Sequence, residues 1–403
     1  MPVNPPRLSP PLPVPGFQLG TASCGVKSPE LKGKRTDLTM ITADVDCHAA
    51  GAFTQNRFRA ACVDLGEQAI AEHGTAIRGI IANSGNANAG TGIKEESWAR
   101  AMIESASAAS GINPQHMLSA STGVIGTPFP IERIQAGMNE AANTLTDDCW
   151  QDAAEAIRTT DTFAKWASRT VGEYTITGIA KGSGMIHPNM ATMLSFIATD
   201  APLTQTQLQT MLNAAVSQSF NSISVDGDTS TNDTVYLLSS GLGLGHNQLA
   251  DTAGFAAALT SLCIELAQMI VRDGEGVSKF VTIHISGAAN SDEARCVGRC
   301  IAISPLVKTA FAGSDANWGR IISAAGNSGI DFDPAQVSLK ADDLIMLEGG
   351  ELYPDYRDED GMTVFAQDEF TIALDLGMGT ACATIWTGDL THDYITINAE
   401  YRT

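Results

Sequence analysis

Positive charge and aromatic side chains are both scarce in this sequence of 403 residues. Lys and Arg total 24 against 45 Asp and Glu, which gives a net charge of −21, and aromatic residues make up 6%. An acidic surface of this kind is poorly matched to the phosphate backbone of nucleic acids and to anionic membrane lipids. We therefore expect neither nucleic acid nor a membrane as a partner.

Long apolar runs are missing as well. No stretch approaches the roughly 18 consecutive apolar residues that a membrane-spanning helix needs. The proline-rich segment 1–17 lacks the apolar core of a signal peptide and the Arg-rich pattern of a mitochondrial transit peptide. These features predict a cytoplasmic protein.

The cysteines form no recognisable framework. They are Cys24, Cys47, Cys62, Cys149, Cys263, Cys296, Cys300 and Cys382. Scattered cysteines in a long chain without a secretion signal predict reduced thiols rather than disulfides. Cys296 and Cys300 lie four residues apart, but one pair without a second is a weak metal signal. We expect no metal site.

What the sequence does contain is a mixture of strand and helix patterns. Strand character occurs at 36–46, 60–66, 78–85, 162–180, 193–201, 369–377, 379–388 and 393–401, and helical periodicity at 94–110, 131–143, 147–158, 203–219 and 250–272. Interspersed strands and helices predict an α/β or α+β fold with layered sheets.

One segment, KGSGMIHPNMATMLSF at 181–196, suggests chemistry. Its two glycines free the backbone, Pro188 fixes a turn, and the small Ala191 leaves its carbonyl open to attack. The Thr192 hydroxyl can attack that carbonyl, and hydrolysis of the resulting ester makes Thr192 a new N-terminus. Its α-amine, with a pKa of about 7.7–8.0, then serves as a base for its own hydroxyl. By itself, the pattern is also that of an ordinary turn entering a core strand.

Nine sequence blocks in a fixed order decide between these two interpretations. They are GAFTQNR (51–57), NSGNANAGTG (83–92), STGVIG (121–126), TTDTFAK (159–165), AKGSGMIHPNMATMLSF (180–196), NSISVDGDTSTNDT (221–234), VRDGEGVSKF (271–280), SPLVKTAFAGSDANWGRI (304–321) and INAEYRT (397–403). With these blocks the chain resembles, from about residue 16 to its end, the ornithine acetyltransferase family, also called the bifunctional glutamate N-acetyltransferase family of arginine biosynthesis.

The resemblance implies a layered α/β fold related to self-processing N-terminal-nucleophile enzymes of the ornithine acetyltransferase and aminopeptidase type. It implies cleavage at Ala191–Thr192 into chains 1–191 and 192–403, which fold together, and an assembly of two copies of each chain. The implied substrates are N-acetyl-L-ornithine and L-glutamate, with no cofactor. Acetyl-CoA is an additional donor in bifunctional members, and the sequence leaves its use open.

Residue roles follow from the matched blocks. Thr192 matches the family nucleophile, and Thr122 and Gly123 match its oxyanion-hole pair. The implied substrate contacts are Thr159, Lys181, Thr192, Glu275, Asn398 and Thr403, with Thr160 as an alternative to Thr159. Lys181 suits the carboxylate of N-acetylornithine, and Glu275 suits its ammonium group or the acceptor amine.

Two further motifs have expected structural roles. We expect 225–233 to be a turn bracing the site rather than a calcium loop, because it lacks the register ending in Glu. We expect the Asn side chains of 83–92 to hold a loop near the site.

Two alternative functions are also compatible with the sequence. A self-processing hydrolase would pass the acyl group to water instead of glutamate, and an uncleaved pseudo-enzyme would act only as a binding scaffold.

Overall fold

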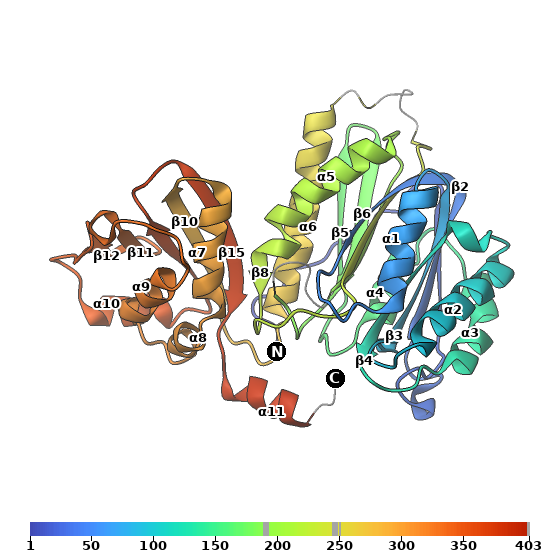
Figure 1. The fold of residues 1–403 in the computed structure, drawn as a ribbon, viewed down its shortest axis with the longest axis horizontal. Coiled ribbons are helices and arrows are strands. Elements are labelled where there is room, and N and C mark those ends of the chain that lie inside the picture. The colour runs from blue at the N-terminus through green and yellow to red at the C-terminus, as the bar shows by residue number, and fades with distance from the viewer. Residues whose placement is uncertain (188–192, 244–248, 250, 401–403) are drawn as a thin grey trace.

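The computed structural model describes residues 1–187, 193–243, 249 and 251–400. The chain forms two sheet-based units that lie side by side (Figure 1). The larger unit has an 8-stranded sheet in the order β4-β3-β2-β9-β7-β6-β5, with β1 also paired to β2. Its strands are β1 (Phe17–Ala22), β2 (Leu38–Phe53), β3 (Ile77–Asn86), β4 (Met117–Val124), β5 (Lys165–Val171), β6 (Tyr174–Lys181), β7 (Leu194–Thr199) and β9 (Thr234–Ser239).

The long strand β2 divides this sheet into two halves. Its first residues, from Leu38 to Thr42, pair with β1 and β3, whereas its last ones, from His48 to Phe53, pair with β9. Apolar side chains of the two halves meet in one buried cluster that includes Ile41 and Leu118 from one half and Phe196 from the other. The two halves are therefore packed face to face.

Helices cover the outer faces of both halves. The helices α5 (Gln205–Gln218) and α6 (Thr252–Arg272) share a core cluster with β6 and β7, and α2 (Lys94–Ser110) and α3 (Ile131–Asn143) share another with β1 and β2. Two more helices, α1 (Ala61–His73) and α4 (Trp150–Ile157), also contribute side chains to the clusters of this unit. The resulting order of helices, sheet, sheet and helices confirms the layered α/β fold.

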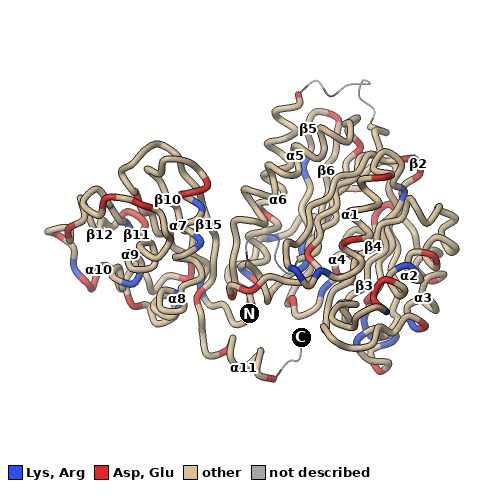
Figure 2. Tube along the Cα trace, viewed as in Figure 1, with Lys and Arg blue, Asp and Glu red and all other residues tan. Residues whose placement is uncertain are grey.

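The apolar helix α6 packs in the core of the larger unit. Among the described residues, α6 is the one helix with the length and hydropathy to cross a membrane. Its Phe255, Leu259 and Leu262 side chains are buried against the sheet. Figure 2 shows that acidic residues, in red, are distributed along the chain in both units, with basic residues, in blue, among them.

The smaller unit contains a 7-stranded sheet in the order β13-β12-β11-β14-β10-β15-β8. Its elements are β8 (Ile223–Ser224), β10 (Phe280–Ala288), α7 (Ser291–Ile303), α8 (Pro305–Ala312), α9 (Trp318–Gly326), β11 (Ser338–Ala341), β12 (Leu344–Glu348), β13 (Glu351–Leu352), α10 (Asp358–Phe365), β14 (Glu369–Asp375) and β15 (Ala381–Gly388). Because Ile223 of β8 pairs with Trp386 of β15, a segment between α5 and β9 joins the sheet of the second unit. The last helix, α11 (His392–Glu400), returns from this unit toward the larger one (Figure 1).

Two of the predicted strands are wrong. The segment 60–66 begins α1, because Cys62, Val63, Gly66 and Ile70 are buried at the spacing of one helix face. The segment 393–401, as far as it is described, lies in α11. Its β-branched residues predicted a strand, but no residue of α11 is buried and it pairs with no sheet.

Candidate active site

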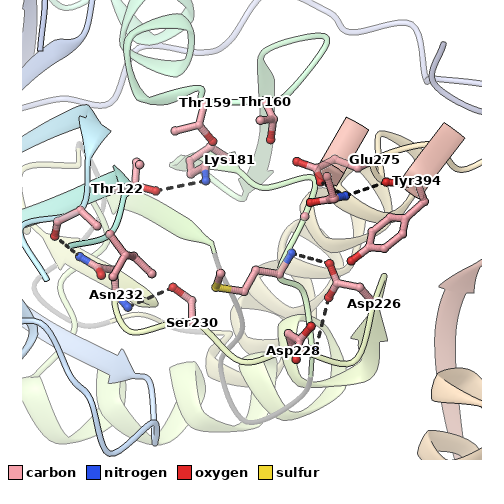
Figure 3. A pocket seen from close by; sticks show the side chains of 16 residues that line it. Thr122, Thr159, Thr160, Lys181, Asp226, Asp228, Ser230, Asn232, Glu275 and Tyr394 are labelled. Atoms are coloured by element: carbon pink, nitrogen blue, oxygen red, sulfur yellow. Dashed lines mark hydrogen bonds between the residues drawn. The ribbon is translucent and has the colours of Figure 1, made fainter. Parts of the chain in front are cut away.

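A cavity of about 200 Å³ lies where several elements of the larger unit end, close to α11 (Figure 3). Its lining comes from the end of β4 (Thr122, Gly123), the loop before β5 (Thr159, Thr160), the end of β6 (Lys181), the loop after α6 (Glu275) and α11 (Tyr394, Asn398). Residues far apart in the sequence therefore converge on one space.

Gly123, next to the last residue of β4, has a conformation that only glycine tolerates. Its φ is +133°, and a Cβ added there would lie 2.3 Å from the carbonyl carbon of Gly85 and 2.5 Å from the nitrogen of Asn86. The two parallel strands β3 and β4 approach too closely at this point for any side chain. Glycine at position 123 therefore allows the backbone path on which Thr122 and Gly123 line the cavity.

Lys181 supplies a buried positive charge to the cavity. Only 2% of the residue is exposed, and its Nζ donates to Thr122 Oγ1 at 3.2 Å. Burial lowers the pKa of this lysine, while the nearby Asp161 carboxylate opposes that shift. Among the described residues, Thr122 is its hydrogen-bond acceptor, so N–H donors remain for a bound anion.

Carboxylates occupy another part of the same cavity. Glu275 accepts a hydrogen bond from Asn398 Nδ2 at 3.0 Å, and its backbone N–H donates to the Ser183 carbonyl at 2.9 Å. A Cβ at Gly184 would lie 2.4 Å from Glu275 Oε2, so glycine makes room for this side chain. Asp226 and Asp228 also line the cavity.

Asp226 is fixed by the chain that leads toward the predicted cleavage bond. Its carboxylate accepts from the N–H of Met185 at 2.6 Å and of Ile186 at 2.9 Å. Met185 has a φ of +58°, which is unfavourable for a residue with a side chain. Burial raises the pKa of Asp226 to about 6. The expected turn at 225–233 therefore braces the site and also lines it.

Tyr394 points toward Asp226 from α11 (Figure 3). Burial raises the pKa of its hydroxyl, and the charges of Asp226, Asp228 and Glu275 raise it further. The phenol is therefore a neutral donor that faces three carboxylates.

The two threonines of the 159–160 pair both reach the cavity. Thr160 Oγ1 lies 2.6 Å from Ser183 Oγ, and the N–H of Thr159 donates to Asp161 Oδ2 at 3.0 Å. Because both side chains line the space, Thr159 and Thr160 are both available to a ligand.

The structure brings most of the motif residues together. These are Thr122, Gly123, Thr159, Thr160, Lys181, Glu275 and Asn398. Ala191, Thr192 and Thr403 lie outside the described residues. Directly after Thr192 in the sequence, Met193 is buried, and its N–H donates to Asp233 Oδ1 at 3.1 Å. Leu194 then pairs with Lys181 in the β6–β7 ladder.

Sequence reasoning missed several lining residues. Asp226, Asp228, Ser230 and Asn232 belong to the bracing turn, whose Asp-Gly-Asp spacing was the available signal. Asn232 Nδ2 donates to the carbonyls of Ala87 at 2.6 Å and Ser121 at 2.9 Å. This amide ties the Asn-rich loop 83–92 to the end of β4.

Comparisons with known proteins identify the family of the chain. The model of the ArgJ family matches residues 18–403. The arginine biosynthesis bifunctional protein ArgJ of Chlorobaculum tepidum is 47% identical over 392 residues, covering 96% of each chain. The protein of that name from Pseudomonas syringae pv. tomato is 43% identical over 401 residues, covering 97% of each.

A solved structure gives the same result. The crystal structure of the arginine biosynthesis bifunctional protein ArgJ from Bacillus halodurans matches with a TM-score of 0.50 at 41% identity. The match covers 52% of this chain and 100% of that one. The chain belongs to the ArgJ family.

Proposed function

We propose that this protein is a self-cleaving acetyltransferase that moves the acetyl group of N-acetyl-L-ornithine to L-glutamate. Membership of the ArgJ family supports acetyl transfer in arginine biosynthesis. The observation that carries the choice of donor is the polarity of the cavity, with the Lys181 ammonium in one part and Glu275, Asp226 and Asp228 in another. N-acetylornithine has a carboxylate for the first and a side-chain ammonium for the second.

The reaction begins with processing of the chain. The Thr192 hydroxyl attacks the Ala191 carbonyl, the peptide nitrogen leaves from that carbon, and an ester links the two residues. Water then hydrolyses the ester. Thr192 keeps its hydroxyl and gains a free α-amine, which acts as the general base for the same hydroxyl.

Acetyl transfer proceeds in two halves. Thr192 Oγ attacks the acetyl carbonyl of N-acetylornithine, its proton passes through the α-amine to the leaving nitrogen, and ornithine departs. The α-amine of glutamate then attacks the acetyl-threonine ester and releases N-acetylglutamate. Thr122 and Gly123 donate hydrogen bonds to the oxyanion formed in each half, a contribution worth about 100- to 1,000-fold per donor. No step uses a metal or a bound cofactor.

Replacement of Thr192 tests this mechanism. Thr192→Ala removes the hydroxyl, so we expect one full-length band on a denaturing gel and no release of ornithine. Thr192→Ser keeps a hydroxyl and, after cleavage, an α-amine, so it should retain both reactions in part. Two bands of wild-type size from Thr192→Ala would contradict the proposal.

The acceptor is tested separately. With wild-type enzyme and N-acetylornithine, ornithine release that continues in the absence of glutamate would identify a hydrolase. Release that needs glutamate, with formation of N-acetylglutamate, is the expected result. An intact species of 42.3 kDa in mass spectrometry, together with no turnover, would identify a binding scaffold.

We also propose acetyl-CoA as a second donor, because its thioester can acetylate the same Thr192 hydroxyl. The bifunctional names of the relatives support a second activity. The expected result is N-acetylglutamate formation from acetyl-CoA and glutamate without ornithine derivatives, and no product would restrict the enzyme to N-acetylornithine.

A further inference from the structure

Lys165 is a buried lysine outside the set of residues that line the cavity. Its side chain and those of Asp161 and Asp273 are all 0% exposed. Lys165 Nζ donates to Asp161 Oδ1 at 2.7 Å, to Asp273 Oδ2 at 2.6 Å and to the Phe163 carbonyl at 3.3 Å. All three N–H groups of the ammonium therefore have acceptors within the protein.

The two carboxylates extend these contacts into the chain around the cavity. Asp161 Oδ1 also accepts from the N–H of Gly182 at 2.6 Å, and Asp161 Oδ2 accepts from the N–H of Thr159. Asp273 Oδ2 accepts from the N–H of Thr162 at 3.0 Å, and its Oδ1 accepts from the Thr162 hydroxyl. One ammonium thereby joins the loop before β5, the turn after β6 and the loop after α6.

Each of the three joined segments carries lining residues. Thr159 and Thr160 lie in the first, Gly182 directly follows Lys181, and Asp273 lies two residues before Glu275. Ser183 connects the same segments from the other side, through its hydroxyl to Thr160 and its carbonyl to the N–H of Glu275. The cationic and the anionic parts of the cavity are therefore both tied to Lys165.

We propose that Lys165 is a positioning residue for acetyl transfer: through Asp161 and Asp273 it fixes the relative positions of Thr159, Lys181 and Glu275 without touching the substrate. This inference rests on the proposed function. The charges of Asp161, Asp273, Lys165 and Lys181 cancel. Loss of Lys165 leaves two buried carboxylates with a single ammonium, which destabilises the fold and removes the link between Asp161 and Asp273.

A pair of variants separates positioning from stability. Lys165→Met should lower both the melting temperature and kcat/KM for N-acetylornithine, the latter about 100-fold and mainly through KM, because displacements near 1 Å in an active site have effects of that size. Adding Asp273→Asn removes the surplus buried charge and should restore much of the stability. The ammonium that links the positions of residues 161 and 273 is still missing, so kcat/KM should stay low.

Lys279→Met is the matched control. Lys279 is also buried, at 6% exposure, but its ammonium donates to the carbonyls of Phe365 and Gln367 in the smaller unit. This variant should lose stability and keep wild-type kcat/KM.

L-ornithine binding, measured by isothermal titration calorimetry, gives a readout that needs no turnover. We expect Kd to rise with KM in Lys165→Met and in the double variant. Recovery of kcat/KM and ornithine affinity together with stability in the double variant would overturn the proposal, as would wild-type values in Lys165→Met. A wild-type protein that binds ornithine without turnover would contradict the proposed function alone, and one that does not bind it would overturn both.

Discussion

Lys181 is the residue whose charge most directly tests the proposed substrate orientation. A hydrogen bond to a charged group contributes about 1.5–3 kcal/mol, so Lys181→Met should raise KM for N-acetylornithine roughly 10- to 100-fold. Steady-state kinetics checks this. Lys340→Met, at an exposed position of β11, is the control and should leave KM unchanged. An unaltered KM in Lys181→Met would place the substrate carboxylate elsewhere.

Asp226 gives ligand binding a dependence on pH. Burial raises its pKa from the usual 3.8 to about 6, and the carboxylate form is the one that attracts an ammonium group. Affinity for L-ornithine should therefore be highest above about pH 6 and fall as the pH drops through that value. Between pH 3.8 and 6 the folded protein holds a proton that the unfolded chain releases, so this group's contribution to stability decreases as the pH rises.

Calorimetric titration of ornithine at pH 7 and pH 5 checks the Asp226 prediction. Asp226→Asn cannot ionise, so its ratio of Kd values at the two pH values should be close to one. If the variant keeps the wild-type ratio, another group is responsible for the effect.

At the scale of elements, the end of β4 depends more on Gly123 than on the nearby Gly126. Gly123 and Gly126 both have positive φ, and strain from a side chain there costs about 1–2 kcal/mol in either case. Only at Gly123 would a new Cβ also collide with the β3 backbone, since nothing lies within 4 Å of the corresponding position at Gly126. Gly123→Ala should abolish turnover, and Gly126→Ala should only lower the melting temperature. If Gly123→Ala turned over substrate as fast as Gly126→Ala, β3 and β4 would be able to separate without disturbing the site.

The elements also show what sequence patterns can and cannot predict. The helices α2 and α3 occupy the predicted ranges 94–110 and 131–143, because apolar residues on one helix face pack on the sheet. A short apolar run such as 60–66 fits either a strand or one turn of a buried helix, and tertiary packing decided for α1. Because α11 is exposed, its sequence has no clear pattern of buried residues on one helix face. Its β-branched residues therefore favoured the prediction of a strand.

The residues of the candidate site also differ in whether the sequence predicts them. Thr122, Lys181, Glu275 and Asn398 were predicted because family blocks contain them, although no local pattern links positions so far apart. Tyr394 was missed because the helix that carries it was predicted as a strand. Its role depends on where α11 lies, which long-range packing decides.

At the scale of the whole molecule, the larger sheet interleaves the two predicted chains. In the order β2-β9-β7-β6, the inner pair follows residue 192 and the flanking strands precede it. The buried Lys165–Asp273 ion pair crosses the same boundary. Separation of the chains would break the β2–β9 and β6–β7 backbone ladders at once.

The cleaved chains should therefore remain together under native conditions. Size-exclusion chromatography with light scattering should show one species containing both chains, and we propose twice the 42.3 kDa of a single copy as its mass. Denaturant should be needed to resolve the chains. Their separation in native buffer would mean that the interleaved ladders do not hold the molecule together.

The interleaved sheet also sets a problem for synthesis. β2 and β6 are complete when the ribosome reaches residue 181, but their inner neighbours end with β9 at Ser239. At about 5–20 residues per second, that interval lasts roughly 3–12 s. During it the nascent chain holds two strands with unpaired edges, which readily pair with other chains. We therefore expect the growing polypeptide, rather than the finished enzyme, to be the form of this protein most exposed to aggregation and most in need of chaperones.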